Sequence, residues 1–110
     1  MKKLLIRNAN LVNEGSVRET DVLVEGERIT KIQSSIKVDN SVCQIDADGQ
    51  FLIPGMIDDQ DHFREPGLTH KADLATESTA AVAGGITSFM EMPNVNPQTT
   101  NKDALQNKYK

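Results

Sequence analysis

Hydrophobic residues in the first half of the chain occur in short runs separated by turn residues. Two of these runs stand on either side of Glu25-Gly26-Glu27, and glycine accepts positive φ without steric cost, so a β-hairpin is predicted there. Another two flank the turn signal at residues 46–49. The runs are residues 4–6, 10–12, 21–24, 28–32, 43–45 and 51–53. Residues 1 to about 53 are therefore predicted to form a set of short strands.

From Pro54 onward the pattern changes to strand, loop, helix and strand. A helix is predicted after Asp73, which is a suitable N-cap, with Leu74, Ala81 and Val82 on one face. The pair Gly84-Gly85 would end this helix.

A second strand is predicted over residues 86–90, and another helix is predicted to begin near Thr100 or Asn101 and to continue past the last residue. Strands that alternate with helices favour a parallel sheet. The fold class is therefore α/β from Pro54 onward.

The strand that starts near Pro54 ends in a group of polar and charged side chains. If the strand is regular, alternation places Asp58, Gln60, His62 and Arg64 on one face and Asp61 on the other. A carboxylate, an amide, an imidazole and a guanidinium would then lie in a row near the carboxyl end of a strand, where barrel enzymes hold their active sites.

Two sequence blocks resemble one enzyme family. Residues 54–67, Pro-Gly-Met-Ile-Asp-Asp-Gln-Asp-His-Phe-Arg-Glu-Pro-Gly, resemble the Pro-Gly-x-Ile-Asp-x-His-x-His-x-Arg-Glu-Pro-Gly motif of the dihydroorotase branch of the amidohydrolase superfamily. Residues 92–97, Met-Pro-Asn-Val-Asn-Pro, resemble its Met-Pro-Asn-Thr-x-Pro block. The resemblance implies part of a small β-sandwich domain over residues 1–53, followed over residues 54–110 by the first two β/α units of a metal-dependent hydrolase (β/α)8 TIM barrel.

Length limits what the chain can hold by itself. A complete TIM barrel needs about 250 residues, and this chain has 110. We expect an N-terminal fragment that is inactive alone, with the catalytic aspartate and the remaining metal ligands of the family outside it.

The resemblance also implies a cofactor, one or two Zn²⁺ ions in the full-length protein. His62 matches the second metal-ligating histidine of the motif, whereas Gln60 replaces the first. Glutamine offers a neutral oxygen, which is a weaker zinc ligand than imidazole nitrogen. Gln60 fits either a trait of one lineage or a relative that has lost catalysis.

Further roles follow from the same resemblance. Arg64 and Asn94 match residues that hold the substrate carboxylate, and Asp58 matches a supporting residue below the metals. Asp61 departs from the family, which places an apolar residue there. Three interpretations of Asp61 stay open: a strand-end residue, damage or sequence error, and a substitute metal ligand.

The resemblance predicts a hydrolase that interconverts dihydroorotate and N-carbamoyl-L-aspartate in de novo pyrimidine biosynthesis. One alternative is another cyclic amidohydrolase, similar to a hydantoinase or an allantoinase. Another is a non-catalytic dihydroorotase-like subunit, and a third is a small independent β-rich binding module. The sequence also leaves open whether the full-length protein forms a homo-oligomer.

Composition narrows the partners and the compartment. The chain is 37% hydrophobic and 25% charged with a net charge of -4, which argues against a nucleic acid or a membrane surface as the main partner. Its one cysteine, Cys43, is expected to be a buried strand residue, and a single cysteine is consistent with the reducing cytoplasm. No segment approaches the ~20 apolar residues of a membrane span.

Overall fold

A computed structural model describes residues 2–109, which divide into two compact units, one up to Pro54 and one from Gly55 onward. Each unit has its own sheet. No helix within the described residues is long and apolar enough to cross a membrane.

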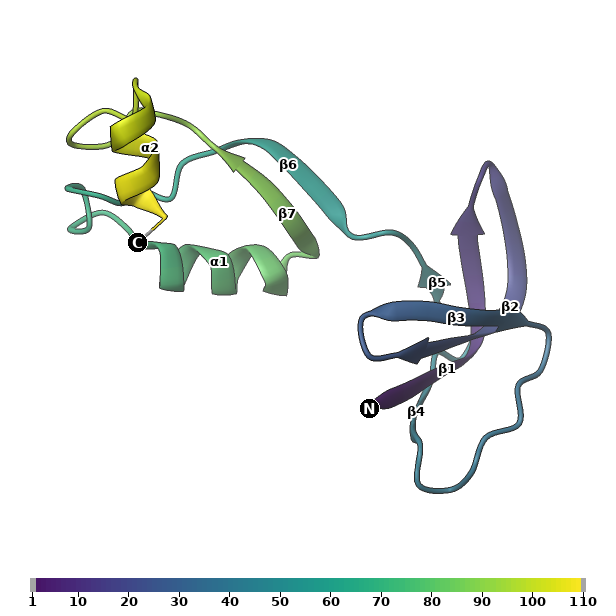
Figure 1. Cartoon of the computed structure of the whole chain (residues 1–110). Helices are drawn as coiled ribbons and strands as arrows, with labels where there is room; N and C mark the ends of the chain where they lie inside the picture. The colour runs from purple at the N-terminus through teal and green to yellow at the C-terminus, as the bar shows by residue number, and fades with distance from the viewer. Residues whose placement is uncertain (1, 110) are drawn as a thin grey trace. The chain divides into compact units, whose positions relative to one another are not determined.

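The first unit is a β-sheet with strand order β3-β2-β1-β4, in which β5 also pairs with β1 (Figure 1). The strands are β1 (Lys3–Asn13), β2 (Ser16–Glu25), β3 (Arg28–Gln33), β4 (Cys43–Asp46) and β5 (Phe51–Leu52). The predicted β2–β3 hairpin is confirmed, with Gly26 at φ 63°. The two predicted runs at residues 4–6 and 10–12 form one strand, because an irregularity between Ile6 and Ala9 allows β1 to continue along β2.

A buried carboxylate that the sequence did not single out secures this unit. Asp21 is 4% exposed, and its Oδ1 accepts a hydrogen bond from the Asn8 backbone N at 3.0 Å. Its Oδ2 accepts from the Ile36 backbone N at 2.9 Å. Asn8 lies at the irregularity in β1 and has φ 53°. Asp21 therefore supplies a hydrogen-bond partner to a backbone amide outside the regular pairing of β1 with β2.

We expect Asp21→Ala to destabilise the first unit by about 3 kcal/mol, because it removes two hydrogen bonds to a charged group and leaves two backbone amides without partners. Urea unfolding followed by circular dichroism measures the change. Glu19→Ala removes an exposed carboxylate from the same strand and is the control. Equal stability of the two variants would contradict the structural role of Asp21.

The expectation that Cys43 is buried is wrong. Cys43 is a free, exposed thiol in β4, and every residue of β4 is exposed. Phe51 in β5 is also 69% exposed. The residue is in a strand as predicted, but no described element covers either face of that strand, so the usual burial of cysteine does not follow.

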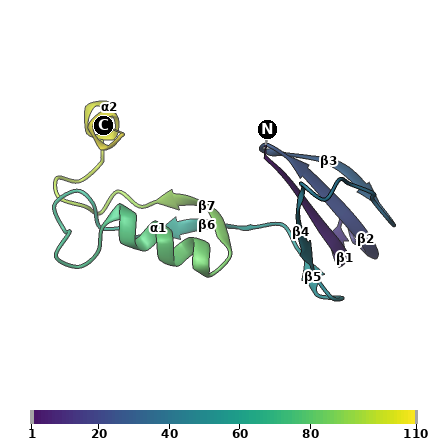
Figure 2. The ribbon, with the colours of Figure 1, turned by 90° about the horizontal axis from the view of Figure 1, so that it is seen from below.

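The second unit contains two β/α segments, β6 (Met56–Asp61) with α1 (Leu74–Ala83), and β7 (Ile86–Glu91) with α2 (Lys102–Lys108). The two strands are parallel, as predicted. Helix α1 lies along this pair of strands and contacts β7 (Figure 1 and Figure 2). Phe63 is 2% exposed and packs on Phe89 with ring centroids 4.2 Å apart, which forms the local core.

Both helices begin where the sequence predicts, whereas the packing of α1 differs from the prediction. Asp73 caps α1 and Asn101 caps α2. Val82, which was predicted to share the packed face of α1 with Leu74, is instead 69% exposed, because β7 is the only described helix or strand that packs against α1. Helix α2 extends to Lys108, and its predicted continuation past the last residue lies outside the described residues.

The cap of α1 predicts a dependence on pH. Asp73 Oδ1 accepts from the Thr76 backbone N at 2.8 Å, and this bond lowers the pKa of Asp73. A carboxyl whose folded pKa is lowered stabilises the fold fully above its unfolded pKa, which is about 4, and less as pH falls through the folded value. We therefore expect the protection of α1 amides, relative to their intrinsic exchange rates, to fall below about pH 4.

Asp73→Asn is the matched variant, because asparagine keeps the cap but does not titrate. Its α1 amides should show a smaller change in protection than wild type between about pH 6 and pH 3. The measurement is hydrogen exchange of α1 amides, corrected for intrinsic rates. The same pH profile in both proteins would contradict the role of the ionised cap.

Candidate active site

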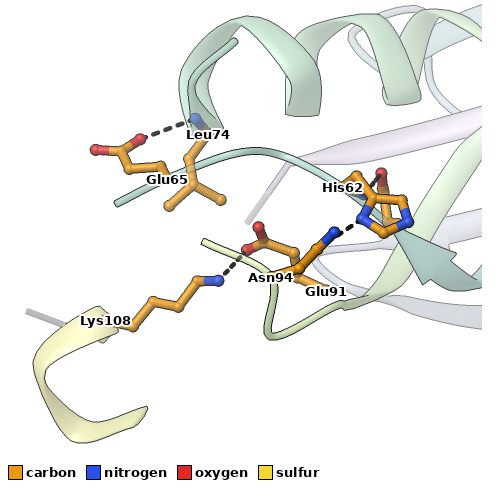
Figure 3. Close-up of polar contacts among 7 residues, drawn as sticks. His62, Glu65, Leu74, Glu91, Asn94 and Lys108 are labelled. Atoms are coloured by element: carbon orange, nitrogen blue, oxygen red, sulfur yellow. Dashed lines mark hydrogen bonds and ion pairs between the residues drawn. The ribbon is translucent and has the colours of Figure 1, made fainter. Parts of the chain in front are cut away.

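The carboxyl ends of β6 and β7 lie side by side and bring two of the predicted site residues together. Asp61, the last residue of β6, pairs in register with Glu91, the last residue of β7, and the Met92 backbone N donates to Asp61 O at 2.9 Å. The two following loops therefore start next to each other. His62 Nδ1 lies 2.9 Å from Asn94 Oδ1 (Figure 3).

The predicted row of four side chains on one strand face is wrong. β6 ends at Asp61, and its pairing with β7 is irregular between Asp58 and Asp61. His62 and Arg64 therefore lie in the loop, where strand alternation does not apply. Arg64 is half-buried and has φ 70°, which lies outside the range of regular strand residues.

Two of the three aspartates of β6 accept hydrogen bonds from nearby backbone. Asp58 Oδ1 accepts from the Gln60 backbone N at 3.0 Å, and Asp61 Oδ1 accepts from the His62 backbone N at 2.6 Å. Both side chains are partly buried. Of the three interpretations of Asp61, these contacts favour a strand-end residue that fixes the start of the His62 loop. Asp58 similarly supports the backbone at Gln60.

Glu65 connects the loop to the helix that follows. Its Oε2 accepts from the Leu74 backbone N at 2.9 Å, so this carboxylate satisfies one of the unpaired amides at the start of α1 (Figure 3). The Asn96 backbone N donates to Pro66 O at 2.9 Å. The loop that carries Arg64 is thus joined both to α1 and to the loop that carries Asn94.

The described residues contain no group of three or more His, Cys, Asp or Glu side chains that could hold a metal ion. Zinc needs three or four protein ligands. His62 fits as one ligand, because Asn94 contacts only its Nδ1. Gln60 is exposed and His70 is an exposed turn residue, so residues 2–109 do not complete a zinc site.

An ion pair that the sequence did not indicate lies beside this region. Glu91 Oε2 and Lys108 Nζ are 2.7 Å apart, with side chains 8% and 13% exposed (Figure 3). They line a pocket of about 460 Å³ between β7 and α2, together with Phe89 and Leu105. His62, Arg64 and Asn94 do not line this pocket, so the largely apolar space belongs to the packing of α2 and not to the candidate active site.

Comparison with known proteins identifies the family. The model of the family described as dihydro-orotase-like matches residues 49–109. The chain belongs to the dihydro-orotase-like family. This confirms the resemblance carried by the two sequence blocks, because both lie within the matched residues.

Curated relatives of this dihydro-orotase-like chain are named dihydroorotase. The protein from Pediococcus pentosaceus is 47% identical over 95 residues, covering 86% of this chain and 22% of the relative. The protein from Methanosarcina acetivorans is 39% identical over 110 residues, covering 100% of this chain and 24% of the relative. The chain thus spans about a quarter of the length of the relatives it matches.

Solved structures of hydantoinases share the fold of this dihydro-orotase-like chain. The L-hydantoinase of Arthrobacter aurescens has a TM-score of 0.83 and 34% identity, covering 98% of this chain and 24% of that one. The dihydropyrimidinase of Brevibacillus agri has a TM-score of 0.79 and 29% identity, covering 96% and 23%. The predicted fold class is confirmed, since an α/β chain with a β-rich first part matches the N-terminal region of these enzymes.

Proposed function

We propose that the protein containing this chain is a metal-dependent cyclic amidohydrolase that interconverts dihydroorotate and N-carbamoyl-L-aspartate in pyrimidine biosynthesis. The observation that carries the proposal is the meeting of His62 and Asn94 at 2.9 Å, at the carboxyl ends of two parallel strands. The relatives named dihydroorotase support the choice of substrate. The 110 residues by themselves are proposed to be inactive.

Each site residue has a role that follows from its chemistry. His62 offers an imidazole nitrogen to Zn²⁺, and Gln60 offers a weaker oxygen beside it. Arg64 can bind the carboxylate of the substrate through two parallel hydrogen bonds. Asn94 accepts at Oδ1 from His62, which leaves its amide nitrogen to donate to the same carboxylate.

Zinc, when bound with ligands from outside residues 2–109, would supply a hydroxide at neutral pH and polarise the amide carbonyl. The residues of this chain would position and recognise the substrate. The free thiol of Cys43 is compatible with the cytoplasm, which we assign as the site of this reaction.

Two other functions have specific support. The hydantoinase structures favour a cyclic amide without a carboxylate as substrate. Gln60, in place of an imidazole, favours a dihydroorotase-like subunit that binds a partner and does no chemistry. The carboxylate on the substrate separates the first alternative from our proposal, and turnover separates the second.

The deciding experiment measures hydrolysis by the protein containing this chain, with added Zn²⁺, of dihydroorotate, dihydrouracil and hydantoin. We expect the highest kcat/KM with dihydroorotate, because only this ring carries a carboxylate for Arg64 and Asn94. A preference for hydantoin or dihydrouracil would establish the hydantoinase alternative. No turnover by the folded protein, or by its Gln60→His variant, would favour the non-catalytic subunit.

Zinc retention tests the incomplete ligand set. We expect the 110-residue chain, loaded with Zn²⁺ and dialysed, to keep far less than one zinc per chain, because His62 is one good ligand where three or four are needed. Elemental analysis measures the content, with His62→Ala as the control. One zinc per chain that disappears in His62→Ala would overturn the expectation.

A further inference from the structure

The contact between His62 and Asn94 bears on which ring nitrogen of His62 carries the proton. The atom of Asn94 that faces the ring is the amide oxygen, which accepts hydrogen bonds and has no hydrogen to donate. A hydrogen bond over the 2.9 Å between Nδ1 and Oδ1 therefore requires the proton to be on Nδ1. In the neutral ring, Nε2 then carries the lone pair.

We propose that Asn94 is a positioning residue that holds His62 in its Nδ1-protonated form and so presents Nε2 to the metal. A neutral imidazole free in water favours the opposite form, with the proton on Nε2 and no lone pair there. Asn94 would therefore reverse the intrinsic preference of His62. The role of the metal in this inference rests on the proposed function, whereas the position of the proton does not.

The backbone next to both residues is held by hydrogen bonds. The His62 backbone N donates to Asp61 Oδ1 at 2.6 Å, which ties down the start of its loop. On the other side, the Val95 backbone N donates to Pro93 O at 2.9 Å, and the Val95 side chain is 5% exposed. The exposed Asn94 side chain thus extends from an anchored backbone, which lowers the entropic cost of keeping the bond in water.

The same geometry gives Asn94 two separable functions. Its Oδ1 accepts from His62, and its amide nitrogen makes no hydrogen bond with the described residues. Aspartate at this position would keep an acceptor for His62 but would replace the donor with a negative charge. The exchange of Asn94 for alanine or aspartate therefore separates the positioning of His62 from the recognition of a substrate carboxylate.

The first test is ¹⁵N NMR of the metal-stripped protein containing this chain, labelled at histidine and studied at about pH 8.5, where an ordinary histidine is neutral. His62→Gln assigns the signals. We expect wild type and Asn94→Asp to have the proton on Nδ1, and Asn94→Ala to move it to Nε2. Asn96→Ala, in the same loop, is the control and should resemble wild type. A wild-type proton on Nε2, or no change in Asn94→Ala, would overturn the proposal.

The second test is zinc affinity of the same variants, measured by competition with a chelator and without substrate. Loss of a residue that orients a metal-ligating histidine typically costs 10–100-fold in metal affinity. We expect Asn94→Ala to bind zinc about 10–100-fold more weakly and Asn94→Asp to restore the affinity. Equal affinity of wild type and Asn94→Ala would show that Asn94 does not present Nε2 to a metal.

The two tests also separate this inference from the proposed function. Neither uses turnover, so a protein that fails to hydrolyse dihydroorotate can still show the reversal of the His62 proton and the loss of zinc affinity. If the protein is active, Asn94→Asp should raise KM for dihydroorotate, since its carboxylate repels the substrate. An unchanged KM in Asn94→Asp would count against recognition of the substrate carboxylate by Asn94. The NMR result would then test the positioning of His62 by itself.

Discussion

Replacing Arg64 with glutamine is expected to lower kcat/KM for dihydroorotate by about a hundredfold or more in the protein containing this chain, because two hydrogen bonds between charged groups are lost in every substrate complex. Arg64→Lys should recover little of the loss, since an ammonium cannot form the paired bonds of a guanidinium. The backbone of Arg64 has φ 70°. Glutamine and lysine meet the same steric restriction there as arginine, so neither variant adds backbone strain. The measurement is steady-state kinetics in both directions of the reaction.

The control for this prediction is Lys71→Gln, which removes an exposed cation from the same loop. It should leave kcat/KM close to wild type, because an exposed, solvated charge contributes only weak, screened attraction. Hydrolysis of dihydrouracil, if it occurs, should be equal in wild type and Arg64→Gln. A hundredfold loss toward dihydrouracil as well would mean that Arg64 maintains the loop and does not recognise the carboxylate.

The local signals in the sequence predicted most of the elements because those signals act over a few residues. The N-cap of α1 at Asp73, the hairpin at Gly26 and the parallel pairing of β6 and β7 all appear where the pattern placed them. Capping, turn geometry and the alternation of strands with helices depend on near neighbours. For these features the sequence contained enough information.

Burial was predicted less well, because it depends on what lies across from a strand or helix. Cys43 and Val82 are apolar in character and lie on predicted elements, yet both are exposed in the described chain. Asp21 shows the opposite case, since nothing in its sequence neighbourhood indicated that a carboxylate would be 4% exposed. Its partners are 13 and 15 residues away and meet it only through the folding of the sheet.

The candidate site was predicted by motif more successfully than by geometry. The resemblance selected His62 and Asn94, and the structure places them in contact across 32 residues of sequence. Strand alternation failed for His62 and Arg64 because β6 ends at Asp61 after an irregular pairing. The position of a loop residue is set by its hydrogen bonds, such as that from Glu65 to the start of α1, and periodicity carries no information about such bonds.

The buried ion pair between Glu91 and Lys108 is expected to dominate the attachment of α2 to the second unit. Removing one member of a buried pair leaves the other charge without a partner and typically costs about 3–5 kcal/mol. Glu91 is at particular risk, since its Oε1 is already buried without a hydrogen-bond partner among the described residues. We expect Lys108→Met to destabilise the protein by about this amount, measured by urea unfolding.

The double variant Glu91→Gln with Lys108→Met should recover much of the lost stability. It removes the unpaired charge of Glu91 and leaves a neutral amide beside an apolar side chain of similar length. Lys102→Met is the control, since Lys102 is exposed at the start of the same helix and should change stability by less than about 0.5 kcal/mol. Equal effects of Lys108→Met and Lys102→Met would mean that the pair is hydrated in solution. The attachment of α2 would then depend on the apolar contacts of Leu105 and Phe89, which line the same pocket.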